Sequence, residues 1–124
     1  MFNQLHRNLY RPDSGWDPIP EAYAETYNSK IEHSVVEDVI QRIEKYVGNF
    51  SGLKVLDLGG GPGHFSCELA KRGAIVLWYD VSNNYLRLAK ERAELQNVNI
   101  DFEIGYIDQL PNRLSGMFDL VFNR

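Results

Sequence analysis

The sequence predicts an α/β fold, in which parallel strands alternate with helices. Three short strand-like runs are separated by segments whose apolar residues recur with helical spacing, as in successive β-α-β units. A glycine-rich loop follows the first run, and acidic residues stand at the ends of the first two runs. Because parallel strands bring their carboxyl ends to one edge of a sheet, we expect the loop and the acids to meet there.

The N-terminal third is predicted to be a cap segment and one helix, residues 1–47, ahead of an α/β region at 48–124. Aromatic and proline residues are frequent at the start of this segment. Ser29 is expected to cap a helix that ends near Val47. The apolar stripe of this helix should pack on a sheet or a helix. It consists of Ile31, Val35, Val36, Val39, Ile40, Ile43 and Val47.

The first strand is predicted over 53–58, and the helix after it over 64–72. Between them the chain reads D-L-G-G-G-P-G from Asp57 to Gly63. Glycine is needed where the backbone adopts positive φ or must approach a ligand more closely than a Cβ would allow. Such a loop between a strand and a helix is expected to direct backbone N–H groups, and the positive end of the helix dipole, at a bound cofactor.

The second strand is predicted over 74–79, where a continuous apolar run is typical of a strand buried on both faces. Gly73 is placed to end the preceding helix. Asp80 stands at the carboxyl end of the strand, 23 residues after Asp57. An acid at about this distance holds ribose hydroxyls in dinucleotide-binding folds, so we expect Asp80 in the cofactor site. The alternative is that Asp80 only caps the next helix.

The next helix is predicted over 82–97, with Ser82 as its N-cap. A third strand is predicted over 99–104, where polar and apolar residues alternate, and a fourth over 118–122. The region after residue 48 thus alternates between strand and helix as far as the third strand. A longer connection then leads to the last strand.

The segment Asp57–Gly63 resembles the first motif of class I S-adenosylmethionine-dependent methyltransferases, (Asp/Glu)-x-Gly-x-Gly-x-Gly, and matches every fixed position. The dinucleotide fingerprint G-x-G-x-x-G fits worse, because its third glycine would fall on His64 or Ser66. The resemblance implies a Rossmann-like parallel sheet with helices on both faces and strand order 3-2-1-4, truncated after the fourth strand. The chain would then be the N-terminal part of the cofactor-binding domain.

The resemblance also implies S-adenosyl-L-methionine as the cofactor and S-adenosyl-L-homocysteine as the product. Asp57 would contact the methionine amino group. Asp80, followed by Val81, would hold the ribose hydroxyls. The loop glycines would let the backbone approach the methionine portion, and these are Gly59, Gly60, Gly61 and Gly63.

The adenine contact is where the chain departs from the family pattern. The family often reads Gly-Asp-Ala-x-x-Leu-Pro after the third strand, and that acid accepts from the adenine amino group. Aligned on the Leu-Pro pair at 110–111, the acid falls on Tyr106 here. The backbone around Ile107 and the side chain of Asp108 are the candidates to replace it. Otherwise the contact is missing and Asp108 is a solvated loop acid.

The same resemblance predicts roles for other side chains. In the family the segment before the first helix often folds over the cofactor, which makes Tyr23 and Tyr27 lid candidates; the alternative is ordinary aromatic packing. His64 either touches the carboxylate of the cofactor or points to solvent. Cys67 is expected to be a small buried packing residue. Asp119 is expected to organise the turn into the fourth strand.

These implications make the chain a methyltransferase whose methyl acceptor and catalytic residues the sequence does not identify. The formal net charge is −4 and Lys and Arg form no cluster, which favours a small-molecule acceptor over nucleic acid. With no apolar signal sequence and no run long enough to span a membrane, a cytoplasmic protein is expected. A single cysteine without ligand spacing predicts no metal site. The alternatives are a non-catalytic cofactor-binding fragment and an NAD-type half-domain.

Overall fold

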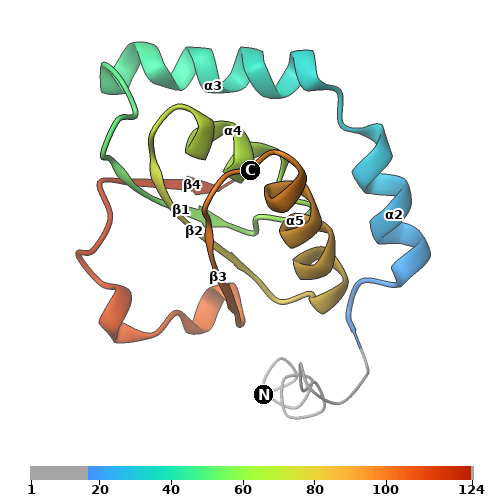
Figure 1. Ribbon diagram of the computed structural model, residues 1–124. Coiled ribbons are helices and arrows are strands. Elements are labelled where there is room, and N and C mark those ends of the chain that lie inside the picture. Colours follow the sequence, from blue (N-terminus) through green and yellow to red (C-terminus); the bar gives the residue numbers. More distant parts are fainter. Residues whose placement is uncertain (1–16, 124) are drawn as a thin grey trace.

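The computed structural model describes residues 17–123, which form one four-stranded sheet with helices before and between the strands (Figure 1). The strands are β1 (Lys54–Leu58), β2 (Ile75–Asp80), β3 (Asp101–Ile104) and β4 (Leu120–Asn123). The α-helices are α2 (Glu21–Lys30), α3 (His33–Val47), α4 (His64–Lys71) and α5 (Asn83–Leu95). Two short 3-10 helices, η1 (Ile107–Gln109) and η2 (Asn112–Leu114), lie between β3 and β4.

The sheet is parallel throughout and has the order β3-β2-β1-β4, so the predicted fold class and strand order are confirmed. In this register Asp57 on β1 lies beside Trp78 on β2 and Phe122 on β4. The four strands end at the same edge of the sheet. There the backbone N–H of Gly59 donates to the carbonyl of Tyr79 at 2.7 Å, which ties the start of the glycine loop to the end of β2.

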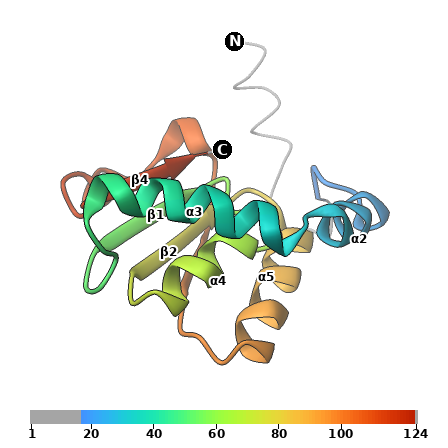
Figure 2. The same ribbon diagram turned by 90° about the horizontal axis from the view of Figure 1, so that it is seen from above.

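The two faces of the sheet are covered differently. Helices α3 and α4 pack over the face that carries Val55 and Val76, and α5 packs over Trp78 on the same face. The other face is covered in part by η2 and its neighbouring loop, through Leu114 (Figure 2). Among residues 17–123, no α-helix packs on this second face, and Val121 of β4 is 54% exposed there.

The described part of the N-terminal region, residues 17–47, differs from the prediction, because it contains two helices where one was expected. Ile31 and Glu32 adopt extended conformations, with ψ angles of 114° and 139°, and separate α2 from α3. Ser29 lies inside α2, where its hydroxyl donates to the carbonyl of Thr26 at 2.9 Å. The predicted cap at Ser29 is therefore wrong. A serine can bond back to its own helix as readily as it caps one, and the sequence does not distinguish the two.

Helix α3 packs into the main core through Val36 and Ile40, which are 2% and 0% exposed. Val35, which was predicted in the same apolar stripe, is 42% exposed. The same core contains residues from the sheet, so α3 packs as part of the α/β unit. The division into a cap segment at 1–47 and a domain at 48–124 stays a prediction.

Three local predictions are confirmed. The Ser82 hydroxyl accepts from the backbone N–H of Tyr85 at 3.0 Å and caps α5. Gly73 follows α4 with a φ of +94°, a conformation that favours glycine at a helix end. The backbone N–H of Lys54 donates to the Asp119 carboxylate at 2.9 Å, so Asp119 joins the beginnings of β1 and β4.

Candidate functional site

The glycine loop between β1 and α4 is held against β2 by Trp78. The indole Nε1–H of Trp78 donates to the carbonyl of Gly61 at 2.9 Å. Gly59 and Gly61 have φ angles of +76° and +55°, a region that other residues rarely adopt. A Cβ on Gly60 would lie 2.1 Å from the Trp78 ring. The loop therefore needs glycine at three successive positions, for two different reasons.

The backbone N–H groups of the loop bond within the protein, which corrects the expectation that they point at a cofactor. Those of Gly59 and Gly60 both donate to the carbonyl of Tyr79, at 2.7 and 3.2 Å. That of Gly61 donates to the Asp80 carboxylate at 2.9 Å. The loop instead offers a ligand the space beside Gly61, where nothing lies within 4 Å of the position that a Cβ would take.

Gly63 serves helix packing in this structure. Its N–H donates to the carbonyl of Gly60 at 3.2 Å. A Cβ at position 63 would lie 2.9 Å from the Cβ of Ala89 in α5, so α4 and α5 approach each other this closely only because Gly63 has no side chain. Its predicted contact with a cofactor stays a prediction.

Asp57 is a buried carboxylate near the end of β1, with 3% of its surface exposed. The Ser66 hydroxyl donates to its Oδ2 at 2.5 Å. Burial raises the pKa of Asp57 to about 6, the Ser66 hydrogen bond opposes this rise, and the negative charge of Asp80 adds to it. An ionised carboxylate in this place is a favourable neighbour for a cationic group, because a nearby positive charge offsets the cost of its desolvation.

Asp80, at the end of β2, is better supplied with donors. Its Oδ2 accepts from the N–H of Gly61 at 2.9 Å, and its Oδ1 from those of Val81 and Ser82, at 2.7 and 3.1 Å. Burial raises the pKa of Asp80, these three hydrogen bonds lower it, and the charge of Asp17 raises it. A carboxylate offers about four acceptor sites, so Asp80 keeps about one for a ligand hydroxyl.

A cavity of about 170 Å³ opens beside the loop. Asp57 and the loop residues 59–62 line it, and Tyr27 of α2 contributes to its wall. The lid role of Tyr27 stays a prediction. Tyr23 is 57% exposed and stacks on Tyr27 with 6.3 Å between ring centroids, and it does not line the cavity. The remaining lining residues are Ile31, His64, Phe65 and Phe122.

The residues predicted to contact adenine lie near the loop and outside this cavity. Ile107 of η1 has its Cδ1 atom 3.5 Å from the position that a Cβ would take on Gly59, and 43% of its surface is exposed. Asp108 is exposed in the same 3-10 helix. Val81 is half-buried after Asp80. Ile107 therefore borders the glycine loop, whereas Asp108 and Val81 are not part of the cavity wall.

Sequence reasoning missed Ser66 and Trp78, which bond Asp57 and Gly61. A usable signal existed for Trp78, because a buried indole N–H needs an acceptor and the glycine loop is the nearest irregular backbone. Ser66 gave no signal, because a serine inside a predicted helix is ordinary. These two side chains orient the groups that face the cavity.

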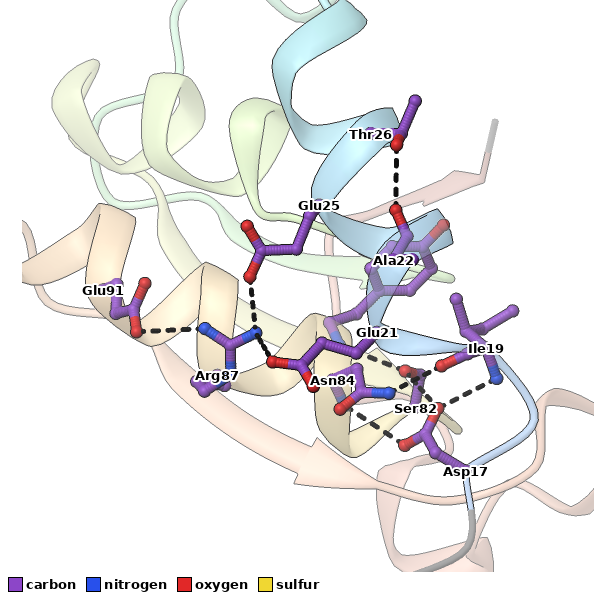
Figure 3. A network of polar contacts seen from close by, with 11 residues as sticks. Asp17, Ile19, Glu21, Ala22, Glu25, Thr26, Ser82, Asn84, Arg87 and Glu91 are labelled. Atoms are coloured by element: carbon purple, nitrogen blue, oxygen red, sulfur yellow. Dashed lines mark hydrogen bonds and ion pairs between the residues drawn. The ribbon is translucent and has the colours of Figure 1, made fainter.

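Asp17, which precedes α2, reaches the start of α5 (Figure 3). Its Oδ1 accepts from the Ser82 hydroxyl at 2.8 Å, and its Oδ2 from the backbone N–H groups of Asn83 and Asn84, at 2.5 and 3.1 Å. The N-terminal segment is thereby fixed next to the carboxyl end of β2, across 65 residues of sequence. Ion pairs from Arg87 of α5 to Glu21 and Glu25 also join α5 to α2, and Arg87 pairs with Glu91 within α5.

His64, the first residue of α4, faces α2. Its Nε2 lies 3.0 Å from the carbonyl of Asn28, so Nε2–H is the donor. Burial and the positive charge of Arg92 lower the pKa of His64 to about 4, and the ring is neutral at pH 7. It therefore lines the cavity without the charge that would attract a carboxylate. Cys67 is fully buried, and burial raises its pKa to about 11, as fits the predicted packing role.

A larger groove, of about 990 Å³, lies at the amino ends of β2 and β3 between α4 and α5. It contains neither the glycine loop nor the two buried acids, so the smaller cavity is the candidate site. Between residues 17 and 123, no three His, Cys, Asp or Glu side chains are grouped so that they could hold a metal ion. No helix in that range is both long and apolar enough to cross a membrane.

Comparison with known proteins places these features in a family context. A family model described as a methyltransferase domain matches residues 49–124. The ubiquinone biosynthesis O-methyltransferase of Acinetobacter baylyi is 35% identical over 80 residues, which are 64% of this chain and 34% of that protein. The chain thus spans about a third of the length of this curated relative.

Solved structures are similar over larger parts of the chain. Magnesium protoporphyrin IX methyltransferase from Synechocystis, with bound SAH, is 29% identical with a TM-score of 0.63, over 73% of this chain and 41% of that one. A protein from Methanococcus maripaludis is 22% identical with a TM-score of 0.75, over 90% of this chain and 53% of that one. The second similarity shows that the fold is shared.

Proposed function

This chain belongs to the class I S-adenosylmethionine-dependent methyltransferases, and from that membership we propose that the protein transfers a methyl group from S-adenosyl-L-methionine to a small-molecule acceptor, releasing S-adenosyl-L-homocysteine. The observation that carries the proposal is the cavity lined by Asp57 and the glycine loop, beside Asp80, at the carboxyl ends of β1 and β2. The names of two similar proteins, which refer to ubiquinone biosynthesis and to magnesium protoporphyrin IX, support an acceptor of this class.

The groups around the cavity fit this cofactor in kind. Asp57 is the anion for the methionine ammonium, the space beside Gly61 admits the methionine chain, and Asp80 keeps an acceptor site for a ribose hydroxyl. Ligand pockets usually measure about 300–1,000 Å³, and this cavity is about 170 Å³. We therefore assign the methionine portion to the cavity, and the ribose and adenine to the strand ends near Val81 and Ile107.

When bound, the cofactor supplies a methyl group on a positively charged sulfur, which is already activated for transfer. The task of the chain is then alignment in a dry site, which can be worth about 7–11 kcal/mol. Trp78 fixes the loop, Asp57 holds the charged end of the ligand, and Tyr27 excludes water from the cavity. A general base is needed only for an acceptor that must lose a proton. We assign no such base among residues 17–123.

Other parts of the assignment stay predictions. Asp108 is our candidate for the adenine amino group, because it follows Ile107 in η1, and Ile107 borders the glycine loop. Gly63 stays among the residues predicted to contact the cofactor because of its place in the glycine motif. A cytoplasmic location, and the lack of a nucleic-acid partner, are carried forward from the sequence as predictions.

The test compares two glycine variants of the 124-residue chain in thermal melts with S-adenosylhomocysteine and with NADH. Gly61 and Gly116 have φ angles of +55° and +73°, and at neither residue does an atom lie within 4 Å of the position that a Cβ would take. Alanine at either position therefore costs similar strain, about 1–2 kcal/mol. Of these two glycines, Gly61 lines the cavity and Gly116 does not. We expect S-adenosylhomocysteine, and not NADH, to raise the midpoint of the wild-type and Gly116→Ala chains, and Gly61→Ala to lose this response.

A wild-type melt that S-adenosylhomocysteine leaves unchanged contradicts the cofactor assignment. Equal responses of the two variants contradict the placement of the ligand beside Gly61. Methyl transfer is tested by following S-adenosylhomocysteine release with small-molecule, protein and nucleic-acid fractions as acceptors. Release with only the last two fractions contradicts the small-molecule proposal, and binding without any release favours a non-catalytic fragment.

A further inference from the structure

A second pocket, of about 110 Å³, lies where the junction of α2 and α3 meets α4 and α5. It shares Ile31 and His64 with the candidate cofactor cavity, but neither Asp57 nor the glycine loop lines it. We name it the Arg92 pocket. Besides Glu68, its polar lining residues are Asn28, His33, His64, Lys71, Arg92 and Gln96.

Arg92 is a half-buried cation with no carboxylate partner among residues 17–123. Its Nη2 donates to the side-chain oxygen of Asn28 at 2.8 Å, while its Nε–H is buried and bonds to no described residue. The acid that lines the pocket, Glu68, is already held by Arg72, whose Nε lies 3.2 Å from its Oε1. Buried donors without an acceptor are rare in folded proteins, and each calls for an explanation such as a bound ion or water.

His64 adds an acceptor to the same pocket. Because its Nε2–H donates to the carbonyl of Asn28, the lone pair of the ring is on Nδ1. This Nδ1 is also buried and has no partner in the described part of the chain. The ring is neutral at pH 7, because burial and Arg92 lower the pKa of His64. The pocket is therefore lined by a cation and a neutral histidine, each of which has one buried atom without a partner among residues 17–123.

We propose that the Arg92 pocket binds a small oxyanion of the phosphate class. Arg92 and the exposed Lys71 would face its charged oxygens, and hydrogen bonds to an ionised group are about twice as strong as neutral ones. Hydrogen phosphate also carries a hydroxyl that donates to Nδ1 of His64, which sulfate and chloride lack. The volume corresponds to about three to four water molecules at ~30 Å³ each, enough for a phosphate group but not for a large ligand.

The bound anion would connect elements that are distant in sequence. Arg92 comes from α5, His64 and Lys71 come from α4, and Asn28 of α2 is bonded to both Arg92 and His64. The same α2 carries Tyr27 to the wall of the cofactor cavity. The site is thus separate from the proposed methyl transfer and adjacent to it.

Thermal melts in sodium phosphate, sulfate and chloride at matched ionic strength test the proposal on the 124-residue chain. Phosphate should raise the midpoint in a saturable way, sulfate should raise it less, and chloride should not. Arg92→Gln should weaken phosphate binding about 10- to 150-fold. Arg42→Gln removes the same charge from an exposed ion pair with Asp38 on α3, and should leave phosphate binding unchanged.

If Arg92→Gln does not fold, NMR of the wild-type chain decides the question, because the signals of the Arg92 Nε–H and the His64 ring should shift together during a phosphate titration. Static signals, an unsaturable midpoint, or an equal response in the Arg92→Gln chain would overturn the proposal and leave bound water as the partner of both groups. A parallel titration with glycerol phosphate distinguishes two possible ligands. Stronger binding of the ester indicates a phosphorylated molecule, and stronger binding of the free ion indicates inorganic phosphate.

This experiment is independent of the cofactor. Arg92 is not part of the wall of the cavity that holds Asp57, so Arg92→Gln should keep the response to S-adenosylhomocysteine in phosphate-free buffer. A melting midpoint that rises with phosphate but not with S-adenosylhomocysteine contradicts only the proposed function. The converse result contradicts the phosphate site alone.

Discussion

At the scale of single residues, the two buried acids at the strand ends differ in how their charge is compensated. Asp80 accepts three backbone hydrogen bonds, whereas Asp57 accepts one from the Ser66 hydroxyl among the contacts found in residues 17–123. Burial, more than the charge of Asp80, raises the pKa of Asp57 to about 6, and the single hydrogen bond from Ser66 only partly opposes this rise. We infer that its ionised form destabilises the chain until a cation lies beside it, a common cost of a binding site.

Asp57→Asn should therefore stabilise the chain at neutral pH. The folded-state pKa of about 6 exceeds the ordinary value of 3.8, so the folded state binds the proton more tightly than the unfolded state. The destabilisation is absent below about pH 4 and grows as the pH rises through 6, towards about 3 kcal/mol at most. We expect a higher urea midpoint for Asp57→Asn at pH 8, with the difference vanishing below pH 4.

Asp38→Asn is the matched control for this measurement, because Asp38 is exposed on α3 and pairs with Arg42. Its effect should be within about 1 kcal/mol at every pH. A chain with Asp57→Asn that is no more stable than wild type at pH 8 would show that the Asp57 charge is compensated in the folded state. The same variant should bind S-adenosylhomocysteine more weakly, because the ammonium loses its anion.

At the scale of elements, the start of α5 is capped from two directions. Ser82 caps it locally through the N–H of Tyr85, as the sequence predicts. Asp17 adds a second cap from outside the helix, through the N–H groups of Asn83 and Asn84 (Figure 3). The external cap satisfies amides that a single N-cap residue leaves unpaired, and it fixes α2 beside the site.

Asp17→Ala should cost about 1–2 kcal/mol of unfolding free energy, as the loss of a helix cap does. The amides of Asn83 and Asn84 should also exchange with solvent faster, because their acceptor is removed. Glu25→Ala is the control, since it removes only an exposed ion pair with Arg87, worth about 0–1 kcal/mol. Unfolding by urea and amide hydrogen exchange measure the two effects. Equal losses in both variants would show that Asp17 acts as one more surface charge.

At the scale of the whole molecule, the sheet is asymmetric. One face is buried under α3, α4 and α5, and the other keeps Ile75 and Val121 at 53% and 54% exposure. In the order β3-β2-β1-β4, β4 is also an edge strand. An apolar face next to an open edge favours association between chains.

The 124-residue chain should therefore associate as its concentration rises, and Val121→Lys should reduce this association, because a charge on an edge strand opposes strand pairing. Tyr46→Lys introduces the same charge on α3, where Tyr46 is 91% exposed and away from the sheet, and should have no such effect. Sedimentation velocity at several concentrations measures both variants. A wild-type chain that stays monomeric at all of them, or a Tyr46→Lys chain that is equally improved, would contradict this prediction.

Local patterns in the sequence were enough to predict the strands, their order through the family resemblance, the helix caps at Ser82 and Gly73, and the acid and glycines that line the cavity, Asp57 and residues 59–61. These features depend on patterns within a few residues, such as apolar runs, a glycine loop and an acid at a strand end. The break at residues 31 and 32 was not predictable in this way. It depends on the two helices packing against different partners, α2 against α5 and α3 against α4.

The pairing of the polar groups, in contrast, is set by the packing of the folded chain. This packing directs the N–H of Gly61 to Asp80, the carboxylate of Asp17 to the start of α5, and leaves Arg92 and His64 with buried atoms that lack partners among residues 17–123. A hydrogen bond requires two groups within about 3 Å in a suitable orientation. Groups 19 to 66 residues apart meet that condition only after the helices have packed, so no local pattern in the sequence encodes these pairs.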